Sequence, residues 1–229
     1  MEGAKKLKLL PTPWPNDDVP PATATLLAVA SKRALLAAAG PDALVLTSTE
    51  KARHAFKKDA KDNDVVTDFA PDVTLPVPRL RQIAFSADED FLVVSSEAEG
   101  GMAVFAVDDL LQQKKEPGQQ IQTANTPVRA MLPNPSVELS QYMVIILDSG
   151  RLDLVDITTG KTITVREEGV TCAAWSIKGK AFVAGFADGT ATIYMSATRE
   201  ERGRIPRPKG LGEGFTSKLQ AYHQVRYNY

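Results

Sequence analysis

The stretch 171–195 reads TCAAWSIKGKAFVAGFADGTATIYM, and its pattern decides the fold. Three apolar runs of strand length alternate with two turn signals, Ser176-Ile-Lys-Gly179 and Ala187-Asp-Gly189. Asp-Gly between two apolar runs is a strong hairpin signal, because a type I′ turn needs positive φ at its central residues. The stretch therefore predicts three antiparallel strands, at 171–175, 181–186 and 190–195.

Similar units occur upstream, at 128–157 and 81–107. The ends of their first strands, Phe85, Leu132 and Trp175, are 47 and 43 residues apart. A fainter copy at 33–49 turns at Gly40-Pro-Asp42, although the Ala/Leu-rich residues 23–39 fit a helix about as well.

A period in the forties with three or four short strands per unit is typical of β-propeller blades with WD40-like or YVTN-like repeats. The sequence thus predicts an all-β chain with about four blades, each a four-stranded sheet. We expect an N-terminal extension at 1–19, blades at 20–79, 80–125, 126–168 and 169–210, and a non-repeat tail at 211–229.

Composition narrows the class of protein. The 229 residues are 43% hydrophobic and 24% charged, with a net charge of −1, as in an ordinary globular protein. The one cysteine, Cys172, rules out a disulfide within the chain and is expected to be a buried structural thiol, which suits a reducing compartment. The N-terminus lacks the apolar core of a signal peptide, and Lys32 and Arg33 interrupt the longest apolar stretch, so we expect a soluble protein without membrane contact.

Sequence motifs for catalysis or for binding of phosphate or metal are weak. Thr158-Thr-Gly-Lys-Thr162 resembles the end of a phosphate-binding loop, but Val155 stands where that motif needs glycine, and a hairpin turn is the favoured interpretation. The two histidines, His54 and His223, and Cys172 have no metal-ligand spacing. We expect no cofactor, no metal and no enzymatic activity.

Charged clusters lie at the predicted turns. The acidic ones, Asp88–Asp90, Asp108–Asp109 and the pair Asp62 and Asp64, are expected to cap turns and face water. Two basic segments, Lys51–Lys61 and Arg199–Lys209, are expected to be solvated loops or connectors, which we favour over direct nucleic-acid binding.

The segment 142–208 resembles the N-terminal propeller of the cytoplasmic-face nucleoporin that docks the DEAD-box mRNA-export helicase. Three features carry the likeness: the alternating strand Leu152–Asp156, the run Val170–Lys180 with its Trp-Ser and Lys-Gly-Lys, and Ile205-Pro-Arg-Pro208. Similar spacing upstream extends the resemblance over roughly residues 20–210.

The resemblance implies a function and a set of partners. The family's propeller is a ring of seven blades that is not an enzyme, lies at the cytoplasmic face of the nuclear pore complex, and acts with other nucleoporins. Its acidic and apolar loop residues meet basic residues on the helicase's N-terminal RecA-like domain. The only such acid that we can carry over is Glu213, as a partner-binding residue.

The sequence departs from the family pattern after Phe215, which suggests a truncated gene product with an incomplete ring of blades. The alternative that the residues leave open is a generic WD-type scaffold for an unrelated protein complex.

Overall fold

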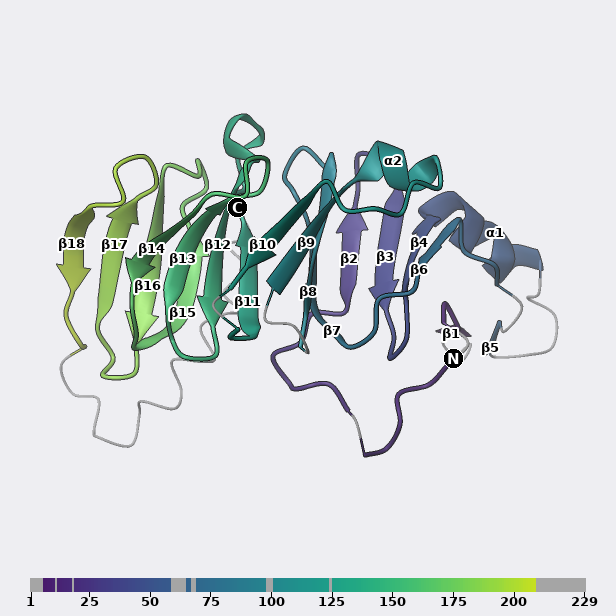
Figure 1. The fold of residues 1–229 in the computed structure, drawn as a ribbon, viewed down its shortest axis with the longest axis horizontal. Helices are drawn as coiled ribbons and strands as arrows, with labels where there is room; N and C mark the ends of the chain where they lie inside the picture. The colour runs from purple at the N-terminus through teal and green to yellow at the C-terminus, as the bar shows by residue number, and fades with distance from the viewer. Residues whose placement is uncertain are drawn as a thin grey trace. The chain divides into compact units, whose positions relative to one another are not determined.

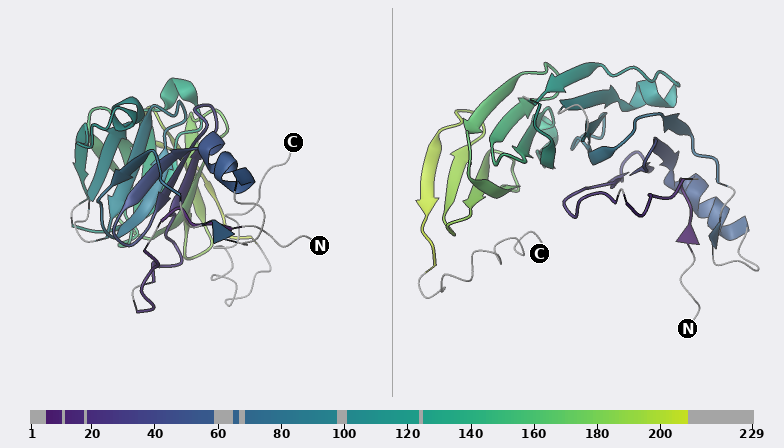
Figure 2. Two further views of the ribbon diagram at one scale, coloured as in Figure 1. Left: turned by 90° about the vertical axis from the view of Figure 1, so that its right-hand side faces the viewer. Right: turned by 60° about the horizontal axis from the view of Figure 1, so that its bottom comes forward.

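Short strands, almost all of them antiparallel, are the main regular secondary structure of the described residues (Figure 1). The computed structural model describes residues 6–10, 12–17, 19–58, 65–66, 69–97, 101–123 and 125–208. It divides into two compact units, residues 1–130 and 131–229, which are described separately. Figure 2 gives two further views of the strands.

The first unit contains two four-stranded antiparallel sheets. The strands of the first sheet are, in order, β2 (Leu27–Ala30), β3 (Leu35–Ala39), β4 (Leu44–Ser48) and β6 (Val73–Leu75). Those of the second are β7 (Leu80–Phe85), β8 (Phe91–Ser96), β9 (Gly101–Ala106) and β10 (Gln119–Gln122).

Shorter elements complete this unit. Helix α1 (Thr49–Lys58) follows β4, and helix α2 (Val107–Leu111) follows β9. Two short strands, β1 (Lys6–Leu7) and β5 (Val65–Val66), pair in parallel.

The second unit repeats the same plan. One sheet has the order β11 (Val128–Pro133), β12 (Tyr142–Leu147), β13 (Leu152–Asp156) and β14 (Thr162–Arg166), with a 3₁₀ turn η1 (Val137–Leu139) after β11. The other has the order β15 (Val170–Trp175), β16 (Ala181–Phe186), β17 (Ala191–Met195) and β18 (Glu201–Ile205).

The structure confirms the repeated four-stranded unit and the three strands predicted within 171–195. It also decides the open question near the N-terminus, because residues 27–39 form strands β2 and β3 rather than a helix. The two strands meet at a tight turn in which Ala34 has φ of 53°, a conformation that a continuous helix does not contain.

The hairpin turn predicted at Ala187-Asp-Gly189 is present, but it is not of type I′. The Gly189 N–H donates to the Phe186 carbonyl at 3.1 Å, and the Phe186 N–H donates to the Thr190 carbonyl at 2.9 Å, so the loop has three residues. Only Gly189 has positive φ, at 85°. The extra residue lets the Asp188 carboxylate accept the Thr190 N–H at 2.9 Å, which stabilises this longer loop.

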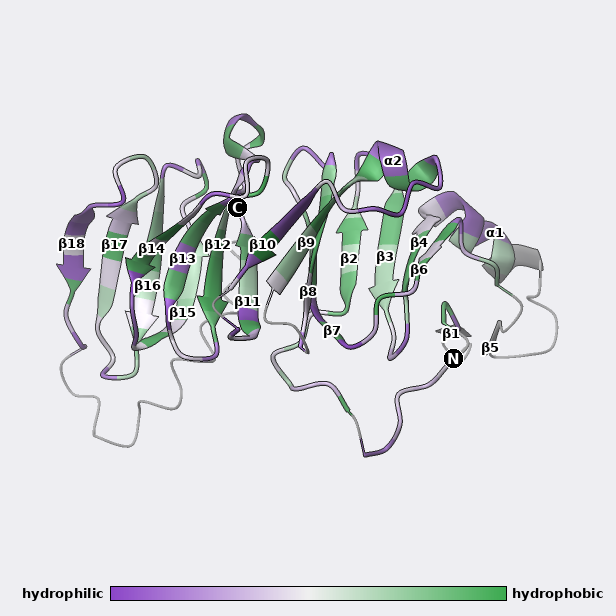
Figure 3. Ribbon diagram, viewed as in Figure 1, coloured by the Kyte–Doolittle hydropathy of each residue, from purple (hydrophilic) through white to green (hydrophobic). Residues whose placement is uncertain are grey.

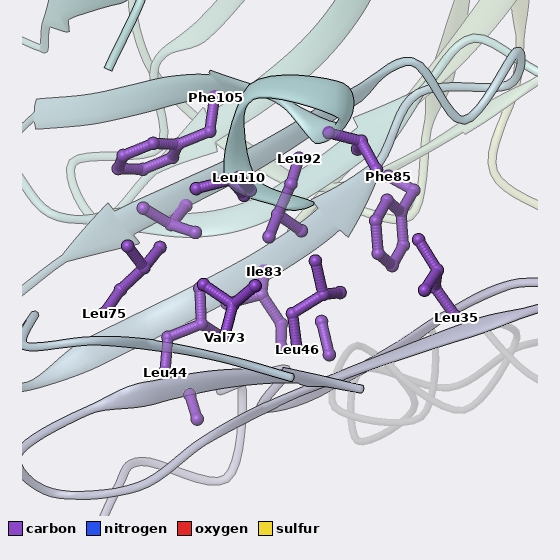
Figure 4. Close-up of a cluster of buried hydrophobic side chains, with 14 of the residues drawn as sticks. Leu35, Leu44, Leu46, Val73, Leu75, Ile83, Phe85, Leu92, Phe105 and Leu110 are labelled. Atoms are coloured by element: carbon purple, nitrogen blue, oxygen red, sulfur yellow. The ribbon is translucent and has the colours of Figure 1, made fainter. Parts of the chain in front are cut away.

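The core of the first unit lies between its two sheets (Figure 4). Leu44 and Leu46 of the first sheet pack with Ile83 and Leu92 of the second, and all four side chains are at most 1% exposed. Leu110 of α2 joins the same cluster, so the short helix is anchored to the sheet by an apolar side chain. At about 25 cal/mol per Å², burial of this apolar surface is the main force that holds the sheets together.

A close contact joins the turns of the second unit. Gly179 ends the turn after β15 with φ of 65°, and its carbonyl accepts the Nδ2–H of the fully buried Asn134 at 2.9 Å. A Cβ at position 179 would lie 1.8 Å from Asn134 Oδ1. Only glycine satisfies both the backbone conformation and this contact.

We therefore predict that Gly179→Ala destabilises the chain by about 2–4 kcal/mol, from the left-handed backbone and the displaced Asn134 hydrogen bond. Urea unfolding followed by circular dichroism measures this change. The matched control is Gly203→Ala in β18, where a Cβ would meet nothing within 4 Å. Equal stability of the two variants would contradict the account of this turn.

Candidate protein-interaction surface

Three neighbouring segments of the first unit form an acidic loop surface: residues 31–34 between β2 and β3, 86–90 between β7 and β8, and 107–114, which includes α2. Five acidic side chains lie on it: Asp88, Glu89, Asp90, Asp108 and Asp109. The strands and Leu110 fix the backbone of these segments, so the surface is built on rigid elements.

Glu89 lies at the centre of this surface. Its carboxylate accepts the backbone N–H groups of Lys32 at 3.1 Å and Arg33 at 2.8 Å, and the residue is 8% exposed. The expectation that the acids at 88–90 all face water is wrong for Glu89. Its φ of 67° places it at the turn position that Gly179 takes in the second unit, and the two hydrogen bonds to the neighbouring sheet offset the backbone strain.

Arg33 forms ion pairs with two acidic residues of the same surface, Asp90 and Asp108. Its guanidinium donates to Asp108 at 2.6 Å and to Asp90, and these two hydrogen bonds raise the pKa of Arg33 above its ordinary value. The side chains of Asp90 and Asp108 remain 53% and 68% exposed, so a partner can still reach their oxygens. Asp109 pairs with Lys114 at 2.8 Å.

The second unit presents exposed apolar side chains on two neighbouring loops. Ile177 is 89% exposed in the turn after β15, and Val137 is 54% exposed in the loop after β11. The Asn134–Gly179 hydrogen bond joins these loops. We call Val137 and Ile177 the apolar loop tips. Single exposed apolar side chains are common on protein surfaces, so these two residues offer only a small apolar area that a partner could bury.

The sequence did not reveal Arg33 or Ile177 as surface residues of interest. The available signal was a repeated four-residue turn. Ser31–Ala34, Ser86–Glu89 and Ser176–Gly179 each begin with serine and end at a residue with positive φ, and Arg33 stands one position before the last residue of the first of these turns. The one committed site residue, Glu213, lies outside the described residues, as do His223, Asp62 and Asp64.

The basic segment Lys51–Lys61 is a helix over its described part, not a loop, because α1 covers residues 49–58. Lys51 donates to Asp72 at 2.8 Å, which fixes the helix against the first sheet. Burial of Asp72 opposes its ionisation, but the hydrogen bonds from Lys51 and the Ser48 N–H outweigh it and hold the pKa of Asp72 below its ordinary value. Arg53 and His54 are exposed on this helix.

The other basic segment, Arg199–Lys209, is partly strand, since β18 spans Glu201–Ile205 and Glu201 accepts from Arg204 at 2.6 Å. Residue 209 lies outside the described part of the chain.

The phosphate-loop-like residues 158–162 form a hairpin turn, as predicted. The Asp156 carboxylate accepts the N–H groups of Thr158 at 3.0 Å and Thr159 at 3.1 Å, and Gly160 has φ of 73°. The turn leads directly into β14, so the N–H groups of Thr158 and Thr159 stabilise the hairpin turn.

Over residues 6–208, gaps excepted, no group of three or more His, Cys, Asp or Glu side chains is placed to hold a metal ion. One hollow of about 230 Å³ in the first unit has a mostly apolar lining that includes Leu9, Leu10, Pro41, Val45, Phe69 and Pro71. In the same part of the chain no helix is long and apolar enough to cross a membrane.

In each four-stranded antiparallel sheet, neighbouring strands follow one another along the chain, and the connecting turns carry charged and apolar side chains. This arrangement defines a β-propeller that presents loop surfaces. The model of the NUP159/214 beta propeller family matches residues 20–224. The chain belongs to this family, which decides against the generic WD-type alternative.

Two curated relatives support the assignment. Nucleoporin NUP159 of Chaetomium thermophilum is 38% identical over 209 residues, which cover 87% of this chain and 14% of the relative. Nucleoporin nup146 of Schizosaccharomyces pombe is 30% identical over 203 residues, which cover 85% of this chain and 15% of the relative. The chain thus spans about a seventh of the length of these relatives.

Solved structures confirm the propeller fold. A chain in the structure of Saccharomyces cerevisiae Dbp5 bound to Nup159, Gle1, IP6 and ADP matches with a TM-score of 0.65 and 17% identity, over 92% of this chain and 56% of that one. The N-terminal domain of Nup159 matches with a TM-score of 0.63 and 16% identity, over 86% and 48%.

For the acidic loop surface we predict that Glu89→Ala destabilises the chain by about 2–4 kcal/mol, because two half-buried backbone N–H groups lose their acceptor. Glu89→Gln, which keeps one acceptor oxygen, is expected to cost less. Urea unfolding measures both variants. The control, Asp109→Ala, breaks an exposed ion pair and is expected to change stability by less than about 1 kcal/mol. A Glu89→Ala variant as stable as this control would contradict the role given to Glu89.

Proposed function

We propose that the chain is a non-enzymatic docking platform for a DEAD-box helicase in mRNA export, located at the cytoplasmic face of the nuclear pore complex. In this role it acts beside other nucleoporins. Its strands form the scaffold, and its loops bind the helicase.

Membership of the NUP159/214 family is the observation that carries this proposal. A structure of S. cerevisiae Nup159 with Dbp5 exists, so a relative with this fold binds a protein of that name. The loops of this chain supply fitting chemistry, since exposed Asp90 and Asp108 can attract basic residues and Ile177 can bury apolar surface.

The proposed contacts include Glu213, which is carried over from the family resemblance. Charges at the rim of an interface mainly set the association rate and its dependence on salt. A direct role in RNA binding through Arg53 and the other basic residues of α1 is the competing proposal, and it predicts affinity for RNA that survives loss of every acid.

The test is a binding titration of the chain against the DEAD-box export helicase from the same source, and against its N-terminal RecA-like domain alone. We expect saturable binding that weakens as salt rises. Glu213→Lys should weaken binding about tenfold, and Ile177→Asp should weaken it by a similar factor. The control is Glu168→Lys, the same charge reversal at an exposed glutamate in the loop that precedes β15, which should stay within about twofold.

Absence of binding by a chain that circular dichroism shows to be folded would contradict the docking proposal. If the chain binds but Glu168→Lys weakens binding as much as Glu213→Lys does, the assignment of Glu213 is wrong and only overall charge matters. Tighter binding to single-stranded RNA than to helicase would favour the competing role.

A further inference from the structure

Four connecting segments of the second unit lie at the same end of its two sheets. They follow β11, β13, β15 and β17, and they are residues 134–141, 157–161, 176–180 and 196–200. Hydrogen bonds join neighbouring segments, and the bonded pairs are Ile157 with Gln141, Asn134 with Gly179, and Ser196 with Lys180. Figure 3 shows purple, hydrophilic residues along these segments, whereas strand β12 is largely green. The four segments therefore form one continuous polar surface.

Positive charge dominates this surface, which we call the basic loop surface. Its two acidic residues are Glu138 and Glu200. Its four basic residues are all exposed, and they are Lys161, Lys178, Lys180 and Arg199. In the part of the chain that the structure describes, none of the four forms an ion pair with an acidic side chain.

The acidic loop surface of the first unit differs in how its cations are used. Arg33 is held by Asp90 and Asp108, and Lys114 is held by Asp109. The chain itself thus supplies carboxylates to these two cations. On the basic loop surface it supplies none, so the carboxylates that could pair with those lysines belong to a partner.

Ile177 and Lys178 stand side by side on a fixed turn of the basic loop surface. The Gly179 N–H donates to the Ser176 carbonyl at 2.8 Å, and Asn134 holds the Gly179 carbonyl. Because the turn is already ordered, a partner loses little binding energy in ordering it. The turn therefore presents an apolar side chain and a positive charge together.

The equivalent turn of the first unit shows that this position stays open when another sheet follows. Lys32 stands in the turn 31–34 where Ile177 stands in 176–179. Glu89 of the following sheet accepts the Lys32 N–H at 3.1 Å, and the residue is nevertheless exposed. A following sheet therefore leaves this turn position accessible to a partner.

The residues around Ile177 decide which kind of segment fits. A basic segment would be repelled by Lys178 and Lys180. Single-stranded RNA is bound through aromatic side chains as well as positive charge, and the four segments contain no Phe, Trp, Tyr or His. An acidic protein segment with an apolar side chain suits both features, since its carboxylates pair with the lysines and its apolar group covers Ile177.

We propose that the segment of the helicase that meets Ile177 is acidic, with its carboxylates facing Lys178 and Lys180. This inference rests on the proposed function, which brings the helicase to Ile177, and it adds the chemistry of the segment bound there. The apolar area at Ile177 is small, so a free peptide binds weakly. A segment of a protein already held by other contacts docks at an effective concentration of about 1 mM, which compensates for the small area.

The first test is the sign of a charge effect in the titration against the helicase. Lys178→Glu should weaken binding about fivefold, whereas Lys178→Arg keeps the charge and should stay within about twofold. The matched control is Lys115→Glu, the same reversal at an exposed lysine of the first unit, which should not weaken binding. Circular dichroism confirms that each variant is folded.

The second test does not depend on the helicase. The probe is a fluorescein-labelled peptide of repeating Glu-Glu-Leu units, and its anisotropy is measured at low salt. We expect the unchanged chain and Lys115→Glu to bind the probe equally, and Lys178→Glu to bind it at least about fivefold more weakly. A labelled oligouridylate, titrated in the same way, should bind more weakly than the peptide.

Unchanged or tighter helicase binding by Lys178→Glu would overturn the proposal, because the helicase would then present no acidic segment to this surface. Equal weakening by Lys115→Glu would also overturn it, in favour of an effect of overall charge. If the unchanged chain does not bind the helicase, the proposed function is contradicted and the peptide decides: binding that depends on Lys178 supports acidic recognition here, and its absence overturns it. Oligouridylate that binds more tightly than the peptide and depends on Lys178 would assign the surface to RNA.

Discussion

The structure depends on one constraint, that a β-sheet with apolar side chains on both faces needs a neighbour on each side. In the first unit Leu44 and Leu46 meet Ile83 and Leu92, and the burial of these side chains joins two sheets that would be unstable alone. In the second unit the sheet of β11–β14 meets the same need, since the consecutive residues Val144 and Ile145 of β12 are both 0% exposed.

Polar contacts between turns then fix how neighbouring sheets align. In the first unit the Glu89 carboxylate accepts two backbone N–H groups from the turn of the next sheet, and in the second unit Asn134 donates to the Gly179 carbonyl. Both contacts occur at the turn position with positive φ. Since the strands use their backbone groups within the sheets, the turns are the parts left to recognise a partner.

The repeat and the class of fold could be predicted from the sequence, because strand alternation and Gly-centred turns are local signals. The contacts of Glu89 and Arg33 could not, since they join residues more than fifty positions apart. Asp88–Asp90 looked like a solvated turn, yet its middle residue is buried. Cys172 was expected to be buried with its apolar run and is only half-buried.

Hydrogen–deuterium exchange of the chain with and without the DEAD-box helicase tests the central claim, that sheets form the scaffold and loops bind. We predict slowed exchange on binding at residues 86–90, 107–114 and 176–179, while exchange in β8, β12 and β16 stays unchanged. New protection confined to the strands, with the loops unaffected, would contradict it.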